Sequence, residues 1–262
     1  MSMASPSAVE FEAVSLINAS QQFSSVLVCE HASNHIPDMF SQLGISSEVA
    51  ESHVAWDPGA FEVSLQLADL LDAPLVKGEV SRLVYDCNRP PQAADAIPEK
   101  SEIFDIPGNR DLDDVDRDVR ILHVYLPFRQ CVTDTIAKSE HLRALITIHS
   151  FTPVYNGEKR DVEIGILHDA DTRLADEMLR LAGQHTGLVV RRNEPYGPQH
   201  GVTHTLQEHA LANNLLNVMI EIRNDLIATP DQCKSVAVML HNLLMDALAN
   251  LDADPSSPEA AT

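Results

Sequence analysis

Two histidines and a glutamate recur in the same kind of place along the chain. His31 and His149 each end a short apolar run, and Glu221 lies inside a third. Short runs rich in β-branched residues, bounded by polar ones, predict buried strands rather than helices. Open α/β sheets bind their ligands at the carboxyl ends of the strands. We therefore expect these three side chains to face one crevice.

Two imidazoles and one oxygen ligand are a common zinc set in hydrolases, because they leave a coordination position for water. His31 and His149 can supply the imidazoles, or they can be unrelated polar ends of two strands. The oxygen ligand has two candidates, Asn34 and Asp57. Asn34 is typical of a turn, and an amide oxygen binds zinc less well than a carboxylate. Asp57 before Pro58 is equally typical of a helix cap, so the residues alone leave this ligand open.

Two glutamates beside these histidines have different expected roles. Glu221 stands in an apolar run, and a carboxylate there must be paired or have a raised pKa. With a raised pKa it can take a proton from water and pass it to a leaving amine. The alternative is a structural ion pair with Arg223 or another arginine. Glu30 has suitable ligand chemistry, but strand alternation would point it away from His31.

Other catalytic and metal-binding patterns are weaker. The sequence contains neither the H-E-x-x-H zinc motif nor a G-x-S-x-G elbow. Ser150 follows His149 directly, which is not the geometry of a catalytic triad. A second candidate for a metal cluster is weaker. It consists of His200, His204 and His209. His200 and His204 are four residues apart, which would bring them together only on a helix, and a helix that includes both is not clearly predicted.

A second polar group lies at the ends of the strand predicted at 82–86. Arg82, Asn88 and Arg89 flank it, and arginine binds carboxylates through two parallel hydrogen bonds while asparagine adds a donor. In so acidic a chain, basic residues gathered at a predicted strand end indicate an anionic substrate group. The alternative is surface pairing with Asp86 or Asp95.

Composition excludes several partners. The chain has 262 residues and a formal net charge of -21, which should repel nucleic acid and anionic membranes. Four cysteines form no C-x-x-C pair, so neither a zinc knuckle nor a redox motif is indicated. The first residues lack a signal-peptide pattern, and no apolar run has membrane-spanning length. We expect a cytoplasmic protein that acts on a small molecule, as a monomer or small homo-oligomer.

Strands that alternate with helices predict an α/β fold with a mainly parallel or mixed sheet. Strands are expected at 26–28, 74–78, 82–86, 145–149, 162–167, 188–191 and 216–222. Helices are expected at 37–43, 57–72, 113–139 (kinked or divided by Pro127), 172–183, 203–212 and 229–248. Long loops are expected at 92–112, 151–159 and 193–201. We predict one domain over residues 21–251, a flexible lead-in over 1–20 and a disordered tail over 252–262.

Six short motifs, in order, resemble the N-formylglutamate amidohydrolase (N-formylglutamate deformylase) family in its shorter form. They are EHASNHIP at 30–37, HVAWDPGA at 53–60, SRLVYDCNRP at 81–90, IHSFTP at 148–153, NEPY at 193–196 and IEIRNDL at 220–226. The family is similar to zinc carboxypeptidases and aspartoacylase-type deacylases. The resemblance implies a three-layer α/β/α sandwich with a central mixed sheet, and a zinc hydrolase that cleaves an amide beside a free carboxylate, for example in histidine degradation.

The resemblance also implies roles for single residues. His31 and His149 match metal ligands, and Asn34 stands where such relatives carry glutamate. Asp57 belongs to a motif shared across the family and is favoured as the third ligand, with Asn34 second. The proton-transferring glutamate corresponds to Glu221, and Arg82 would polarise the scissile carbonyl. The groups expected to hold the substrate carboxylate are Asn88, Arg89 and Arg223.

Overall fold

The computed structural model describes residues 11–19 and 22–253. Its centre is a seven-stranded mixed sheet with strand order β1-β3-β2-β6-β11-β9-β10. In chain order the strands are β1 (Val14–Ile17), β2 (Ser25–Cys29), β3 (Leu75–Gly78), β6 (Ala144–Phe151), β9 (Ile164–Leu167), β10 (Val190–Arg192) and β11 (Leu216–Arg223). The pairs β1–β3 and β11–β9 are antiparallel and the others are parallel. The predicted mixed sheet is confirmed.

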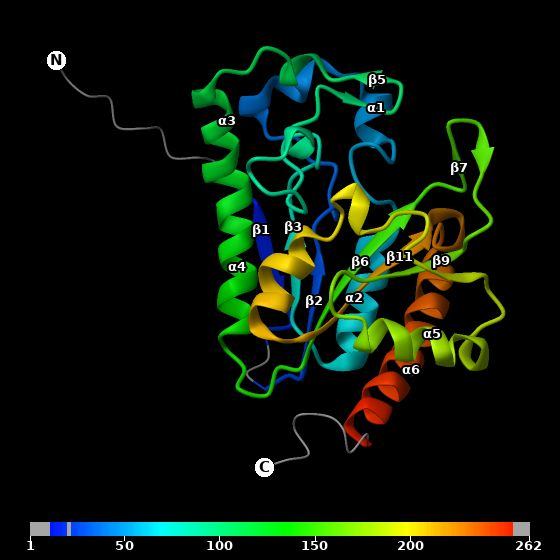
Figure 1. Cartoon of the computed structure of the whole chain (residues 1–262). Helices are drawn as coiled ribbons and strands as arrows, with labels where there is room; N and C mark the ends of the chain where they lie inside the picture. Colours follow the sequence, from blue (N-terminus) through cyan, green and yellow to red (C-terminus); the bar gives the residue numbers. More distant parts are fainter. Residues whose placement is uncertain (1–10, 20–21, 254–262) are drawn as a thin grey trace.

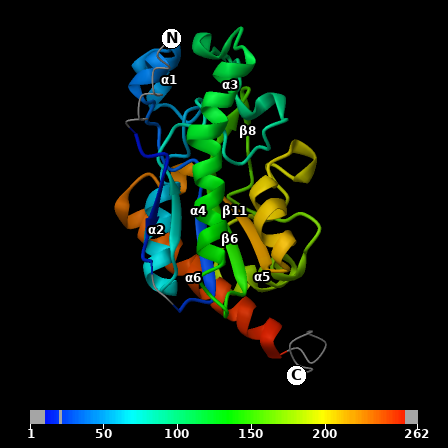
Figure 2. The same cartoon turned by 90° about the vertical axis from the view of Figure 1, so that its left-hand side faces the viewer.

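Helices cover both faces of the sheet, which confirms the three-layer arrangement (Figures 1 and 2). One face packs against α2 (Ala60–Leu71), α5 (Arg173–His185) and α6 (Pro230–Ala253). The other carries α3 (Asp114–Arg120), the π-helical turn η4 (Ile121–Tyr125) and α4 (Leu126–Ile136). Alternate strand residues enter two separate cores, so Ile146 packs on the first side and Leu145 on the second. No helix in the described ranges is long and apolar enough to cross a membrane.

Short helical turns make up much of the remainder. They are η1 (Asp38–Gly44), α1 (Ser47–Glu51), η2 (Ala94–Ala96), η3 (Pro107–Asn109), η5 (Pro198–His200), η6 (Leu206–Ala210), η7 (Leu211–Asn213) and η8 (Asn224–Leu226). Two of the predicted long loops each contain a small hairpin: β4 (Lys100–Ser101) with β5 (Phe104–Asp105), and β7 (Val154–Tyr155) with β8 (Glu158–Lys159). The helix predicted at 113–139 is helical throughout residues 114–136, but it widens into the π-helical turn η4 just before Pro127, which cannot donate a helical hydrogen bond.

Two sequence expectations for the fold are wrong. Val14–Ile17, placed in the flexible lead-in, form β1 and pair with β3 at the sheet edge. Residues 82–86, expected as a strand, form turns in which Val84 donates to the Ser81 carbonyl. The predicted tail begins within α6, which runs to Ala253. The rest of the tail, together with residues 1–10 and 20–21, lies outside the described residues.

The turns over 82–86 are held by a buried arginine of α3. Arg120 donates from Nη1 to the Asn109 side-chain oxygen (2.6 Å) and the Val84 carbonyl (3.2 Å), and from Nη2 to the Gly108 carbonyl (2.8 Å). Asn109 in turn donates to the Leu83 carbonyl at 2.8 Å. Tertiary hydrogen bonds therefore replace the sheet ladder that the local sequence predicts.

Arg120→Met should lower the free energy of unfolding by about 2–3 kcal/mol, because it leaves buried carbonyl groups without donors. Urea unfolding measures this change. Arg117→Met on the same helix is the control and should change stability by less than about 0.5 kcal/mol, since Arg117 is only partly buried. Equal losses in the two variants would contradict the role given to Arg120.

Candidate active site

Three parallel strands bring polar side chains to one edge of the sheet. Val28 of β2 lies opposite Thr147 of β6, and His149 lies opposite Glu221 of β11. Two residues beyond Val28, the chain reaches Glu30, so Glu30, His149 and Glu221 lie in one row. All three are buried. The sequence prediction that the carboxyl ends of these strands meet is confirmed.

The His31 side chain reaches the same edge of the sheet because β2 ends before it. The strand ends at Cys29, and Glu30 and His31 lie in a turn, so the alternation expected to separate their side chains does not continue. Gly78 of β3 makes room for this turn: a Cβ there would lie 2.2 Å from the Glu30 carbonyl oxygen. The Asp57 backbone N–H donates to the His31 carbonyl at 2.9 Å, which ties the two segments together.

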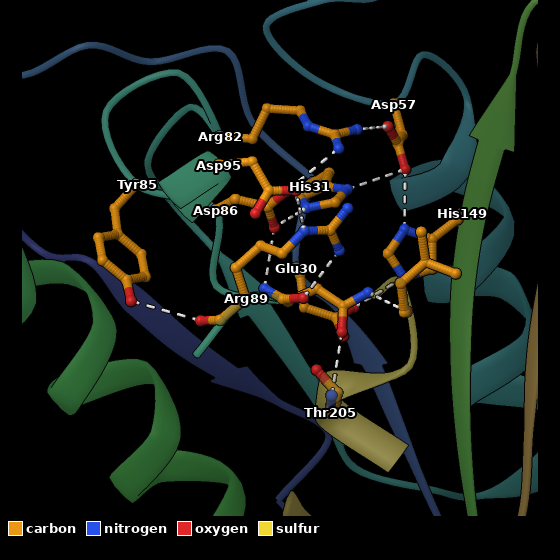
Figure 3. Close-up of polar contacts among 12 residues, drawn as sticks. Glu30, His31, Asp57, Arg82, Tyr85, Asp86, Arg89, Asp95, His149 and Thr205 are labelled. Atoms are coloured by element: carbon orange, nitrogen blue, oxygen red, sulfur yellow. Dashed lines mark hydrogen bonds and ion pairs between the residues drawn. The ribbon is translucent and has the colours of Figure 1, made fainter. Parts of the chain in front are cut away.

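Asp57 is not a helix cap but the centre of the site. Its Oδ2 lies 3.3 Å from Nδ1 of His31 and 3.0 Å from Nδ1 of His149. The position before α2 is taken by Gly59, at φ 80° and without a side-chain cap. Figure 3 shows Asp57 in contact with both imidazoles and with Arg82. The buried carboxylate is thus used for tertiary contacts instead of for the helix start.

The outer nitrogens of the two imidazoles both face carboxylates. Nε2 of His31 lies 2.7 Å from Oδ1 of Asp86, and Nε2 of His149 lies 3.2 Å from Oε2 of Glu30. Burial alone would raise the pKa of the Asp86 carboxyl, but His31 and Arg82 hold it well below its usual range. Carboxylates behind metal-binding histidines fix the ring orientation and leave the inner nitrogens free to bind.

Three atoms that face one another suit a metal ion: the inner nitrogens, Nδ1 of His31 and Nδ1 of His149, and Oδ2 of Asp57. Within the described ranges, His31, Asp57 and His149 are the group whose possible ligand atoms all lie within 4.8 Å of one another, and all three residues are buried. A set of two imidazoles and one carboxylate, backed by further carboxylates, is typical of metal centres in hydrolases. The residues present therefore fit a metal ion, and this geometry favours Asp57 as the third ligand.

Glu221 is the carboxylate that remains available for proton transfer. Its side chain is buried, and its Oε2 has no hydrogen-bond partner within the described part of the chain. Burial, with the charge of Asp57, raises its pKa to about 7, against the opposing effect of His149 and Arg82. A carboxyl group with that pKa can both accept and donate a proton near neutral pH.

Arg82 spans two of the carboxylates. Its Nη1 donates to Oδ1 of Asp57 and its Nη2 to Oδ2 of Asp86, each at 3.2 Å. The side chain stays partly exposed, at 30%. It lines a cavity of about 380 Å³ together with His31, Glu221 and Tyr196. A fixed guanidinium therefore faces the same space as the candidate metal ligands and the candidate base.

Asn88 and Arg89 line this cavity, but most of their polar groups hold the segment 200–205. The Asn88 side chain donates to the Val202 carbonyl and accepts from the Thr205 N–H. Arg89 donates to Asp95 and to backbone carbonyls, those of Asn88, His200 and Gly201. Among the described residues, one of its five N–H groups has no acceptor. Their predicted role in binding the substrate carboxylate stays a prediction.

Two predicted site residues lie elsewhere. The Asn34 amide donates to the Ala50 carbonyl at 3.0 Å, and Asn34 is not among the residues that line the cavity in the described chain. Arg223 lies in a separate groove, where its guanidinium pairs with Glu163 and Asp225. The structure therefore does not bring either residue together with His31 and His149.

The sequence does not predict the contact between His31 and Asp86. The sequence indicated Asp86 only as a surface partner of arginine, and nothing local links it to a histidine 55 residues away. The four-residue spacing from Arg82 to Asp86 is the one available signal, and both side chains do share the site.

Two histidines of the second candidate cluster, His204 and His209, have structural surroundings instead. Nε2 of His204 lies 2.9 Å from the Tyr125 hydroxyl, and His209 is buried. Burial lowers the pKa of His209 to about 4, below the usual value of about 6.5 in an unfolded chain. The unfolded chain therefore binds more protons between pH 7 and 4, and folding stability falls as the pH decreases.

His209 should account for about 2 kcal/mol of lost stability between pH 7.5 and pH 5. His209→Gln should lack this part of the pH dependence, because glutamine does not titrate. Urea unfolding at both pH values measures the difference. The exposed His141 is the control: His141→Gln should lose stability with acid as the unmodified protein does. A His209→Gln variant with the full acid sensitivity would contradict this account.

Comparison with known proteins identifies the family of the chain. The model of the N-formylglutamate amidohydrolase (FGase) family matches residues 23–228. None of the curated proteins compared matches the chain. It is similar to the structure of gene product Atu2144 from Agrobacterium tumefaciens, with 52% identity and TM-score 0.89 over 93% of this chain and 97% of that one. N-formylglutamate amidohydrolase from Ralstonia eutropha JMP134 shares the fold, with 15% identity and TM-score 0.63 over 91% of this chain and 99% of that one. The chain belongs to the N-formylglutamate amidohydrolase family.

Proposed function

We propose that the protein is a metal-dependent amidohydrolase that cleaves N-formylglutamate into formate and glutamate. One observation carries the proposal: the buried group His31, Asp57 and His149 lines the same cavity as Glu221 and Arg82. Membership of the N-formylglutamate amidohydrolase family supports the reaction. The cavity volume of about 380 Å³ is sufficient for a small amino-acid derivative.

Zinc is the metal we propose, because two imidazoles and a carboxylate are a set that it commonly binds. Nδ1 of His31, Nδ1 of His149 and Oδ2 of Asp57 would hold it. When bound, zinc supplies Lewis acidity, which lowers the pKa of water and polarises a carbonyl. Asp86 orients the His31 imidazole from behind through its contact with Nε2, and Glu30 places a carboxylate 3.2 Å from Nε2 of His149.

The proton transfers fall to Glu221. It accepts a proton from the attacking water while the water oxygen bonds to the acyl carbon. Arg82, held in place by Asp57 and Asp86, donates hydrogen bonds to the acyl oxygen as that atom gains negative charge. Glu221 then gives its proton to the amine nitrogen as the C–N bond breaks. The site thus uses one carboxyl group for both transfers.

We propose that the substrate carboxylate lies against the remaining N–H of Arg89. The Asn88 amide can join this grip, because its Nδ2 donates one hydrogen to the Val202 carbonyl and has a second one to donate. Its Oδ1 meanwhile accepts from the Thr205 N–H, which holds the amide in place.

The proposal is tested with purified protein and a panel of N-formyl, N-acetyl and N-succinyl amino acids, assayed with zinc. We expect bound metal and the highest kcat/KM with N-formylglutamate. Preference for another N-acyl amino acid or a short peptide would keep the mechanism and replace the substrate. Absence of bound metal, with no hydrolysis after zinc is added, would contradict the proposal and favour a carboxylate-binding protein without catalysis.

A further inference from the structure

The loop that follows β10 lies directly against the site. Gly165 of β9 is the register partner of Glu221, and a Cβ on Gly165 would lie 2.0 Å from the Glu194 carbonyl oxygen. The loop therefore packs on the bare backbone of β9 beside Glu221. Asn193 fixes its start, donating from its backbone N–H to the Ile166 carbonyl and accepting from the His168 N–H. This packing carries the residues after Asn193 over the edge of the sheet.

Tyr196 of this loop lines the cavity and has one hydrogen to donate. It is half-buried and lines the same cavity as Glu221 and Arg82. Nη2 of Arg160 donates to its hydroxyl oxygen at 2.9 Å. Because a guanidinium cannot accept, the tyrosine is the acceptor in this contact and its own O–H stays available. The described residues offer that hydrogen no acceptor.

The hydroxyl also keeps its proton at neutral pH. Burial raises the pKa of Tyr196, the charge of Glu221 raises it further, and Arg160 and Arg82 oppose the effect. These influences agree with the geometry, which places the ring among the groups that handle charge in the proposed reaction. A neutral O–H is suited to donate to an oxygen that gains negative charge.

Arg160 packs on three aromatic rings, one of them that of Tyr196. Its guanidinium lies over the rings of Phe151 (5.5 Å), Tyr155 (4.6 Å) and Tyr196 (5.0 Å). Its Nη1 donates to the Thr152 carbonyl at 3.3 Å. These contacts join three segments, the end of β6, the β7–β8 hairpin and the loop after β10. A cation fixed on three aromatic faces can direct the hydrogen bond it makes.

We infer that Tyr196 is a catalytic hydrogen-bond donor whose O–H stabilises the acyl oxygen of the substrate, and that Arg160 is a positioning residue that orients this hydroxyl. The inference rests on the proposed function and adds a neutral donor to the charged donor Arg82. The acyl oxygen is the partner because the tyrosine lines the same cavity as Glu221 and Arg82, which act at the scissile bond.

Tyr196→Phe removes the donor and keeps the ring that stacks on Arg160. We expect kcat to fall by about 10²–10³-fold with KM changed by less than about threefold, because the hydrogen bond strengthens only in the transition state. Tyr155→Phe is the matched control, since Tyr155 stacks on the same guanidinium; its kcat should stay within about twofold. Wild-type kcat in Tyr196→Phe, or a change in KM alone, would overturn the catalytic role.

The role of Arg160 is tested by coupling. Arg160→Met should lower kcat in the wild-type background but cause little further loss in Tyr196→Phe, because the two residues act through one hydroxyl. Melting temperatures of all variants check that the fold is retained. Equal losses in both backgrounds would show that Arg160 does not act through Tyr196 and would overturn its positioning role.

The substrate for these assays is the N-acyl amino acid that the wild-type protein hydrolyses fastest. Failure of the inference and failure of the proposed function then give different results. An active wild type with an equally active Tyr196→Phe variant overturns the inference alone. A metal-loaded wild type that hydrolyses no member of the panel overturns the proposed function, and the inference falls with it.

Discussion

Glu221→Gln is expected to lower kcat by about 10²–10⁴-fold, the range that general acid–base groups contribute. The amide has nearly the same shape but cannot take a proton from water or return one to the amine. Burial, which raises the pKa of Glu221 to about 7, disfavours its charged form, so a neutral amide is tolerated at this position. The variant should therefore fold and keep the side chains of His31, Asp57 and His149 in place.

The measurement is kcat together with the metal content per protein chain. Metal content should match the wild type, because Glu221 is not among the three grouped candidate ligands. Glu102→Gln is the control: Glu102 lines the same cavity but is partly exposed and pairs with His53, and the kcat of this variant should change by less than about threefold. A Glu221→Gln variant with near wild-type kcat would show that another group transfers the proton.

The sequence predicts the strands of the site well because their signal is local. The apolar runs before His31 and His149, and around Glu221, identify β2, β6 and β11 without any tertiary information. Parallel strands bring their carboxyl ends to one edge, so the meeting of these side chains follows from the topology. The fold class follows in the same way from the alternation of strands and helices.

The remaining features depend on contacts between distant segments, which local patterns do not contain. Asp57 before Pro58 resembles a helix cap, yet its carboxylate contacts His149, 92 residues further along the chain. The stretch 82–86 resembles a strand, yet Arg120 and Asn109 bind its carbonyls and hold it in turns. Tertiary hydrogen bonds override local propensity in both places.

Of the carboxylates in the site, Asp57 is the one whose loss should weaken metal binding most. Asp57→Asn replaces a charged ligand with an amide. Loss of an outer hydrogen-bond partner lowers metal affinity by roughly 10–100-fold, and we expect Asp57→Asn to lower it further than that. Asp86→Asn removes such an outer partner, because the His31 nitrogen that Asp86 contacts is Nε2, on the far side of the ring from Asp57. The two variants are matched, since both carboxylates also pair with Arg82.

Competition with a chromophoric chelator measures both affinities without relying on activity. Zinc should also raise the melting temperature of the wild type, because a ligand that binds only the folded state stabilises it by mass action. We expect the affinities to decrease in the order wild type, Asp86→Asn, Asp57→Asn, with the zinc-dependent rise in melting temperature decreasing in the same order. The order is informative because, in the part of the chain that the structure describes, Oδ2 of Asp57 is the carboxylate oxygen that lies within 3.3 Å of Nδ1 of both His31 and His149. An Asp86→Asn variant that binds zinc more weakly than Asp57→Asn would move the third ligand from Asp57 to Asp86.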